Sequence, residues 1–169
     1  MHITLRQLLG ACLGIEPHRV RPVQEPCQLC RGPHGRPVVD GVDGMHLSIS
    51  HSRDIGLIEL ATRWLGVDVE AVPSPETVAE IAPLLHPEEE KAVASAAAAE
   101  ERQLLARVWV RKEACLKGVG IGLAWPLSAD SVGAGLEPAD DLPGWAIEDV
   151  PLPGEYAAAV TYGWELLSG

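Results

Sequence analysis

The chain has 169 residues and a formal net charge of −11, and 47% of its residues are apolar. This length suits a single globular domain, and no apolar run approaches the roughly 18 residues of a membrane-spanning helix. Residues 1–66 carry net +1 and residues 67–169 carry net −12. An acidic chain is a poor partner for nucleic acid, so we expect none to bind. The first residues also lack a basic start followed by a hydrophobic stretch, so we expect a cytoplasmic protein that does not bind a membrane.

The first half of the chain predicts one helix, an irregular segment and three strands. Residues 3–14 place apolar groups at helical spacing and end at Gly14, whereas residues 17–44 are rich in Pro and Gly. Apolar residues in alternation or in short runs then predict strands over 45–50, 55–61 and 64–70. The short Thr62-Arg63 link favours a hairpin between the last two of these strands.

The second half predicts three helices followed by three strands. A helix is expected over residues 76–85, a second begins at Pro87, and a long amphipathic one runs from Glu101 to Gly118 or Gly120. The expected strands cover residues 127–132, 145–150 and 155–162. Because helices and strands are mixed without a regular βαβ alternation, the predicted class is α+β.

Two of these elements carry paired charged residues. Asp68 and Glu70 are two residues apart on a strand, so they share a face. Glu113 and Lys117 are four residues apart on the long helix, so they are neighbours there. Three such oxygen ligands suit Mg²⁺. Equally, the strand acids can face solvent, and the helical pair can be an exposed ion pair worth about 0.3–0.5 kcal/mol.

Other polar residues leave more than one interpretation open. His51, at the end of a strand, can donate to a phosphate or serve as a structural hydrogen-bond donor. Arg36 lies in a loop, where it can contact a ligand or be solvated. Cys27, Cys30 and His34 have the spacing of zinc ligands, but a second pair is missing from the sequence; zinc, a redox role and a reduced surface loop remain alternatives.

Three motifs occur in order: Ser48-Ile49-Ser50-His51-Ser52, Gly66-Val67-Asp68-Val69-Glu70 and Trp109-Val110-Arg111-Lys112-Glu113-Ala114-Cys115-Leu116-Lys117. Asp68 and Glu113 are 45 residues apart. With Gly120-Ile121-Gly122-Leu123 and the loop from Gly32 to Pro37, these motifs resemble the 4'-phosphopantetheinyl transferase superfamily, specifically its longer, surfactin-synthetase-activating group. The similarity extends from about Thr4 to Tyr162.

The resemblance implies a pseudo-twofold α+β fold of two similar halves with coenzyme A between them. The halves would be residues 1–66, shortened at the N-terminus, and residues 67–169, which carry the metal site. By the same resemblance, Mg²⁺ would be held by Asp68, Glu70 and Glu113. Lys117 and Arg36 would contact the diphosphate of coenzyme A, and Ser50 and His51 its 3'-phosphate.

The implied reaction transfers 4'-phosphopantetheine from coenzyme A to a serine of an apo acyl or peptidyl carrier protein, releasing adenosine 3',5'-bisphosphate. Glu113 and Lys117 would be the catalytic residues, with either Glu113 or a metal-bound water as the base. We expect a monomer, although a partner chain could supply the missing N-terminal segment. The alternative function is a weak homologue that binds coenzyme A or carrier protein without turnover.

Overall fold

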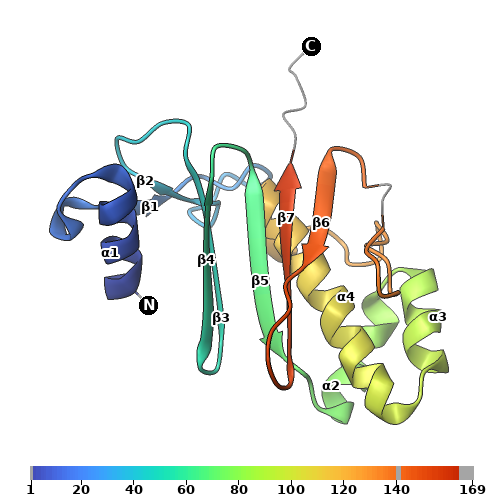
Figure 1. Cartoon of the computed structure of the whole chain (residues 1–169). Helices are drawn as coiled ribbons and strands as arrows, with labels where there is room; N and C mark the ends of the chain where they lie inside the picture. Colours follow the sequence, from blue (N-terminus) through green and yellow to red (C-terminus); the bar gives the residue numbers. More distant parts are fainter. Residues whose placement is uncertain (1, 140–141, 164–169) are drawn as a thin grey trace.

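Strands run through the middle of the molecule, with α1 beyond one edge and α4 packed against the other strands (Figure 1). The computed structural model describes residues 2–139 and 142–163. Its α-helices are α1 (His2–Leu13), α2 (Pro75–Ile81), α3 (Pro87–Ser95) and α4 (Ala98–Val119). Its strands are β1 (Pro22–Gln24), β2 (Pro37–Val39), β3 (His46–Ser52), β4 (Ile55–Ala61), β5 (Leu65–Ala71), β6 (Trp145–Asp149) and β7 (Tyr156–Gly163). These elements confirm the α+β class.

The strand pairing differs from one sequence expectation. β3 and β4 form an antiparallel hairpin, whereas β5 pairs with β7 in a sheet of order β5-β7-β6. The predicted hairpin across Thr62-Arg63 is therefore wrong. β5 forms its backbone hydrogen bonds with β7, which lies near the other end of the chain. The alternation of apolar residues along β5 does not specify such a distant partner.

β3 and β5 lie side by side, joined by side chains where a backbone ladder would otherwise run. Three alternate serines of β3 accept hydrogen bonds from alternate amides of β5: Val67 N–H to Ser48 Oγ (3.0 Å), Val69 N–H to Ser50 Oγ (3.3 Å) and Ala71 N–H to Ser52 Oγ (3.1 Å). The pairs advance together along both strands, so the strands run parallel. We call this contact the serine seam.

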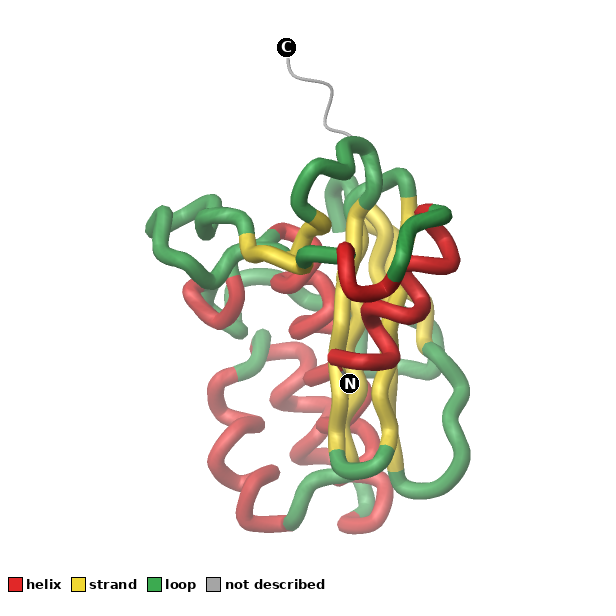
Figure 2. The backbone as a smooth tube through the Cα atoms, turned by 90° about the vertical axis from the view of Figure 1, so that its left-hand side faces the viewer, coloured by secondary structure: helices red, strands yellow, loops and turns green. Residues whose placement is uncertain are grey.

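Two hydrophobic clusters lie on either side of the serine seam. The first joins α1 to β2 and β3 through Leu5, Leu9, Val20, Val39 and Leu47. The second surrounds α4 and includes Val78, Val93, Leu105, Val108 and Ala159. Figure 2 shows α1 in front of the strands and the other helices behind. The strand acids therefore lie between two hydrophobic regions, which a smaller cluster around Leu65, Val67 and Val160 links.

Gly66 allows α4 to lie directly against β5. A Cβ atom at Gly66 would be 1.9 Å from the carbonyl oxygen of Ala114 and 2.5 Å from the amide nitrogen of Gly118, far inside van der Waals contact. The helix ends at Gly120, whose φ of 80° is the left-handed conformation that glycine adopts freely. This close approach brings the last turns of α4 to the strand that carries Asp68.

Residues 127–132 form turns, so the predicted strand there is wrong. Side chains take up backbone groups that a strand would pair with a neighbour. Lys112 Nζ donates to the carbonyl oxygen of Asp130 (2.5 Å), and Val132 N–H donates to Glu89 Oε1 (2.7 Å).

Within the described residues, each helix is too short or too polar to cross a membrane.

Candidate active site

Asp68 lies at the centre of the candidate site. Its side chain is buried, and its Oδ1 accepts hydrogen bonds from Lys117 Nζ (2.6 Å) and Ser50 Oγ (2.7 Å). The other carboxylate oxygen, Oδ2, is buried and has no hydrogen-bond partner among the described residues. A buried carboxylate oxygen without a partner is costly, and a cation would relieve that cost.

Glu70 and Glu113 add two more acids around Asp68. Ser52 Oγ donates to Glu70 Oε2 at 2.9 Å, so the serine seam orients both strand acids. Burial raises the pKa of Glu113, the negative charges of Asp68 and Glu70 raise it further, and the Lys117 ammonium opposes them. The three carboxylates therefore share a region of negative potential that Lys117 only partly offsets.

The three acids are close enough to interact but are not drawn into a tight ligand cluster. In the part of the chain that the structure describes, only Cys27, Cys30 and His34 bring their ligand atoms within 4.8 Å of one another. Like charges repel, so carboxylates that share a site tend to stand apart without a cation between them. The predicted grouping of Asp68, Glu70 and Glu113 as metal ligands remains a prediction.

Arg36 and Lys117 border the same cavity, of about 310 Å³. The guanidinium of Arg36 is buried, donates to Glu25 Oε2 (3.1 and 3.2 Å) and to the carbonyl oxygen of Gly118 (3.3 Å), and lies 4.1 Å from the centre of the Trp64 ring. These contacts join the loop before β2 to the end of α4. The cavity thus has two cationic side chains from distant parts of the chain.

Ser50 and His51 point to different places, because successive residues of a strand face opposite sides. Ser50 is buried and hydrogen-bonded to Asp68 and to the backbone of Val69. His51 is exposed and borders a separate cavity of about 340 Å³ that Arg53 also lines. The structure therefore does not bring the two predicted 3'-phosphate contacts together.

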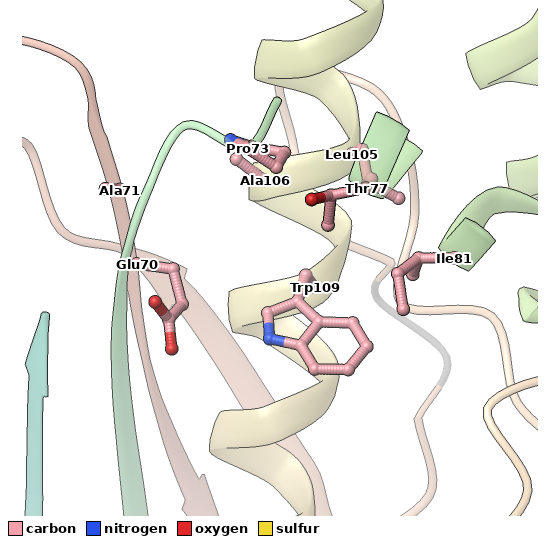
Figure 3. A pocket seen from close by; sticks show the side chains of 8 residues that line it. All are labelled: Glu70, Ala71, Pro73, Thr77, Ile81, Leu105, Ala106 and Trp109. Atoms are coloured by element: carbon pink, nitrogen blue, oxygen red, sulfur yellow. The ribbon is translucent and has the colours of Figure 1, made fainter. Parts of the chain in front are cut away.

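Trp109 and Lys112 have roles that the sequence analysis missed. Trp109 lines an apolar cavity of about 220 Å³ that also borders Glu70, and Figure 3 shows its indole across the gap from the Glu70 carboxylate. Lys112 is buried and pairs with the buried Glu89 at 2.8 Å. Both residues lie in the quoted nine-residue motif, but helical periodicity alone did not distinguish a cavity-lining Trp or a buried Lys from other positions.

Arg111, between them, is also buried. Its guanidinium forms two hydrogen bonds with Asp149 of β6, at 2.8 and 2.6 Å, and donates to the carbonyl oxygen of Gly133 at 2.6 Å. A bidentate arginine–carboxylate pair fixes direction as well as distance. Arg111 therefore fixes α4 against β6, while the opposite side of α4 carries Glu113 and Lys117 towards Asp68.

Known proteins are similar to this chain in sequence. Residues 65–147 match the model of the 4'-phosphopantetheinyl transferase superfamily, a range that includes β5, α4 and the site residues Asp68, Glu70, Glu113 and Lys117. The 4'-phosphopantetheinyl transferase HetI from Nostoc sp. (strain PCC 7120) is 27% identical over 171 residues, covering 95% of this chain and 69% of HetI. Residues 65–147, about half of the chain, therefore carry a domain of this transferase superfamily.

Proposed function

We propose that this protein transfers 4'-phosphopantetheine from coenzyme A to a serine hydroxyl of an apo acyl or peptidyl carrier protein. The observation that carries the proposal is the unpartnered, buried Oδ2 of Asp68 beside Lys117, in a site with two further acids. The similarity to the transferase superfamily supplies the reaction class. Asp68 Oδ2 is the buried anionic oxygen that the described residues leave without a hydrogen-bond donor, and a bound cation could pair with it.

Mg²⁺ fits the donor set of this site. Asp68, Glu70 and Glu113 offer hard oxygen ligands. Asp68 Oδ2 has no hydrogen-bond partner among the described residues, so it is available to bind a cation. When bound, Mg²⁺ would offset negative charge on the diphosphate. Ser50 and Ser52 already hold two of the three carboxylates in place, so their orientation does not depend on the metal.

The cavity between Arg36 and Lys117 is the proposed place for the diphosphate. In the reaction, the serine oxygen bonds to the phosphorus that carries pantetheine, and the bond from that phosphorus to the bridging oxygen breaks. The bridging oxygen leaves with adenosine 3',5'-bisphosphate. Lys117 Nζ, which is partly exposed beside Asp68, is placed to stabilise the charge on that oxygen.

Glu113 is the proposed acceptor of the serine proton. Its raised pKa, caused first by burial and then by the charge of Asp68, makes it a stronger base than an exposed glutamate. A bound water could relay the same proton. For the 3'-phosphate, we retain His51 as the proposed contact, because its cavity also holds Arg53, whereas the hydroxyl of Ser50 already has two partners.

The carrier protein is proposed to dock beside Glu70. The apolar cavity there is lined by Pro73, Ile81, Leu105, Ala106 and Trp109, with Glu70 at its edge (Figure 3). The C-terminal part of the chain is strongly acidic, and carrier domains are expected to be acidic too. Local apolar contacts, rather than general charge attraction, should therefore dominate docking.

Incubation with coenzyme A, Mg²⁺ and an apo carrier protein tests the proposal, with the mass of the carrier as the readout. The carrier should gain one phosphopantetheine, and Glu113→Gln should abolish the gain. Glu100→Gln, the same change at an exposed position of α4, is the matched control and should remain active. No gain with several unrelated carriers, together with tight calorimetric binding of coenzyme A, would instead identify a binder without turnover.

A further inference from the structure

The loop between β1 and β2 gathers three metal-ligating side chains, and His34 among them borders the cavity that Arg36 and Lys117 line. The Sγ atoms of Cys27 and Cys30 and a ring nitrogen of His34 lie within 4.8 Å of one another. Cys30 Sγ and His34 Nε2 are 2.9 Å apart. In a tetrahedral zinc site, two sulfurs each about 2.3 Å from the ion are roughly 3.8 Å apart. The Cys30 sulfur and the His34 nitrogen would have to separate slightly, to roughly 3.5 Å, for both to ligate one tetrahedral ion.

The backbone of this loop folds around the two sulfur atoms. Cys27 N–H donates to the carbonyl oxygen of Gly32 (2.8 Å), and Arg31 N–H donates to that of Cys27 (2.9 Å). Gly32 N–H points at Cys30 Sγ, at 3.4 Å, and Arg31 adopts the left-handed conformation with φ of 62°. Amides that point at sulfur stabilise the thiolate, which is the form that binds metal.

The three ligand side chains differ in their exposure to solvent. The side chain of Cys27 is buried, whereas Cys30 and His34 are exposed. One ligand is thus fixed in the interior, and two remain accessible to an ion from solvent.

Two glycines make the turn tight enough for the cluster. A Cβ atom at Gly32 would be 3.0 Å from His34 Cδ2 and 3.2 Å from Cys30 Sγ, so a side chain there would crowd both ligands. At Gly35 a Cβ atom would be 2.4 Å from the carbonyl oxygen of Glu25. The backbone is therefore shaped for close approach of these side chains.

We propose that Cys27, Cys30 and His34 bind one zinc ion, with solvent or a further residue as the fourth ligand, and that this ion fixes the loop that presents Arg36. Two thiolates and an imidazole favour zinc over the hard cations that carboxylates prefer. Arg36 follows His34 by two residues, and its backbone carbonyl accepts a hydrogen bond from Glu25 N–H at 2.9 Å. The site would thus be structural, and it does not depend on the proposed transferase reaction.

Metal content of the reduced, untagged full chain tests this proposal. After incubation with Zn²⁺ and gel filtration, about one zinc per chain is expected, falling at least about tenfold in Cys30→Ser and His34→Asn, since removing a ligand weakens the site. Both changes are at exposed positions, so circular dichroism should show a folded protein. Cys12→Ser, at the exposed cysteine of α1, is the matched control and should retain full zinc.

A second readout reports on the ligands themselves. Reconstitution with Co²⁺ should give a thiolate-to-cobalt charge-transfer band that Cys12→Ser retains and Cys30→Ser loses. Zinc should also raise the melting temperature of the wild-type chain but not that of Cys30→Ser. Equal zinc in Cys12→Ser and Cys30→Ser would overturn the proposal. So would a fresh protein in which Cys27 and Cys30 form a disulfide and zinc is absent after reduction and reloading.

Discussion

Lys112 and Lys117 both extend from α4 to a buried carboxylate, but the two pairs have opposite surroundings. Lys112 and its partner Glu89 are both buried, and the two oxygens of Glu89 also accept from the amides of Val132 and His86. Lys117 is 31% exposed, and its partner Asp68 retains an oxygen without a partner.

This difference separates structure from function within one helix. A buried charge pair with all its hydrogen bonds formed fixes elements in place, here the beginning of α3 and the loop around Val132. A pair left with a free anionic oxygen beside a cavity can bind something further. The same lysine–carboxylate chemistry therefore has two uses, and the number of hydrogen bonds each pair completes distinguishes them.

Breaking the completed pair should have the largest effect. Lys112→Met leaves Glu89 charged and buried, so we expect a loss of about 3–5 kcal/mol in the free energy of unfolding, measured by urea denaturation. The double variant Lys112→Met/Glu89→Leu should recover part of that loss, because both charges are then gone. A loss below about 1 kcal/mol for Lys112→Met would show that the pair is not a structural support.

Removing one hydroxyl of the serine seam should have the next largest effect. Ser50→Ala removes the acceptor of Val69 N–H and a donor to Asp68, so we expect a loss of about 1–3 kcal/mol in unfolding free energy. Ser95→Ala, at an exposed serine, is the control and should change little. If the two variants are equally stable, the seam contributes nothing measurable.

Neutralising the incomplete pair should cost little stability. Asp68→Asn leaves Lys117 partly hydrated, so the expected loss is below about 1 kcal/mol. In calorimetry, however, Mg²⁺ binding should weaken at least about tenfold, because a charged ligand is lost. Asp149→Asn gives the reverse pattern as control, since Asp149 partners the buried Arg111. Unchanged Mg²⁺ affinity in Asp68→Asn would exclude Asp68 as a ligand.

The smallest effect concerns the pH dependence of metal-free protein in a chelating buffer. Because the pKa of Glu113 is raised above its ordinary value of 4.5, the folded state binds its proton more tightly than the unfolded chain. Stability should therefore fall as pH rises from that ordinary value through the raised one. Glu113→Gln should be more stable than wild type at pH ~7, with the difference vanishing near pH ~3. Glu100→Gln should show no such crossover.

The sequence predicted most helices and strands, because their periodicity is local. It failed at Thr62-Arg63 and at residues 127–132, where the outcome depends on a distant strand or on the side chains of Lys112 and Glu89. The proximity of Asp68 to Glu113 and Lys117 was predicted only through family resemblance. What brings them together is the absence of a side chain at Gly66, which periodicity cannot reveal.

The serine seam also determines which backbone amides of β5 should exchange with solvent first. Three hydroxyl contacts, each worth about 0.5–1.5 kcal/mol, join β3 to β5. The packing of Leu57 and Ala61 against Leu65, Val67 and Val160 joins the same two sides of the seam. The amides of Val67, Val69 and Ala71 donate to serine hydroxyls and not to a backbone ladder. Their hydrogens should therefore exchange with solvent before those of β7.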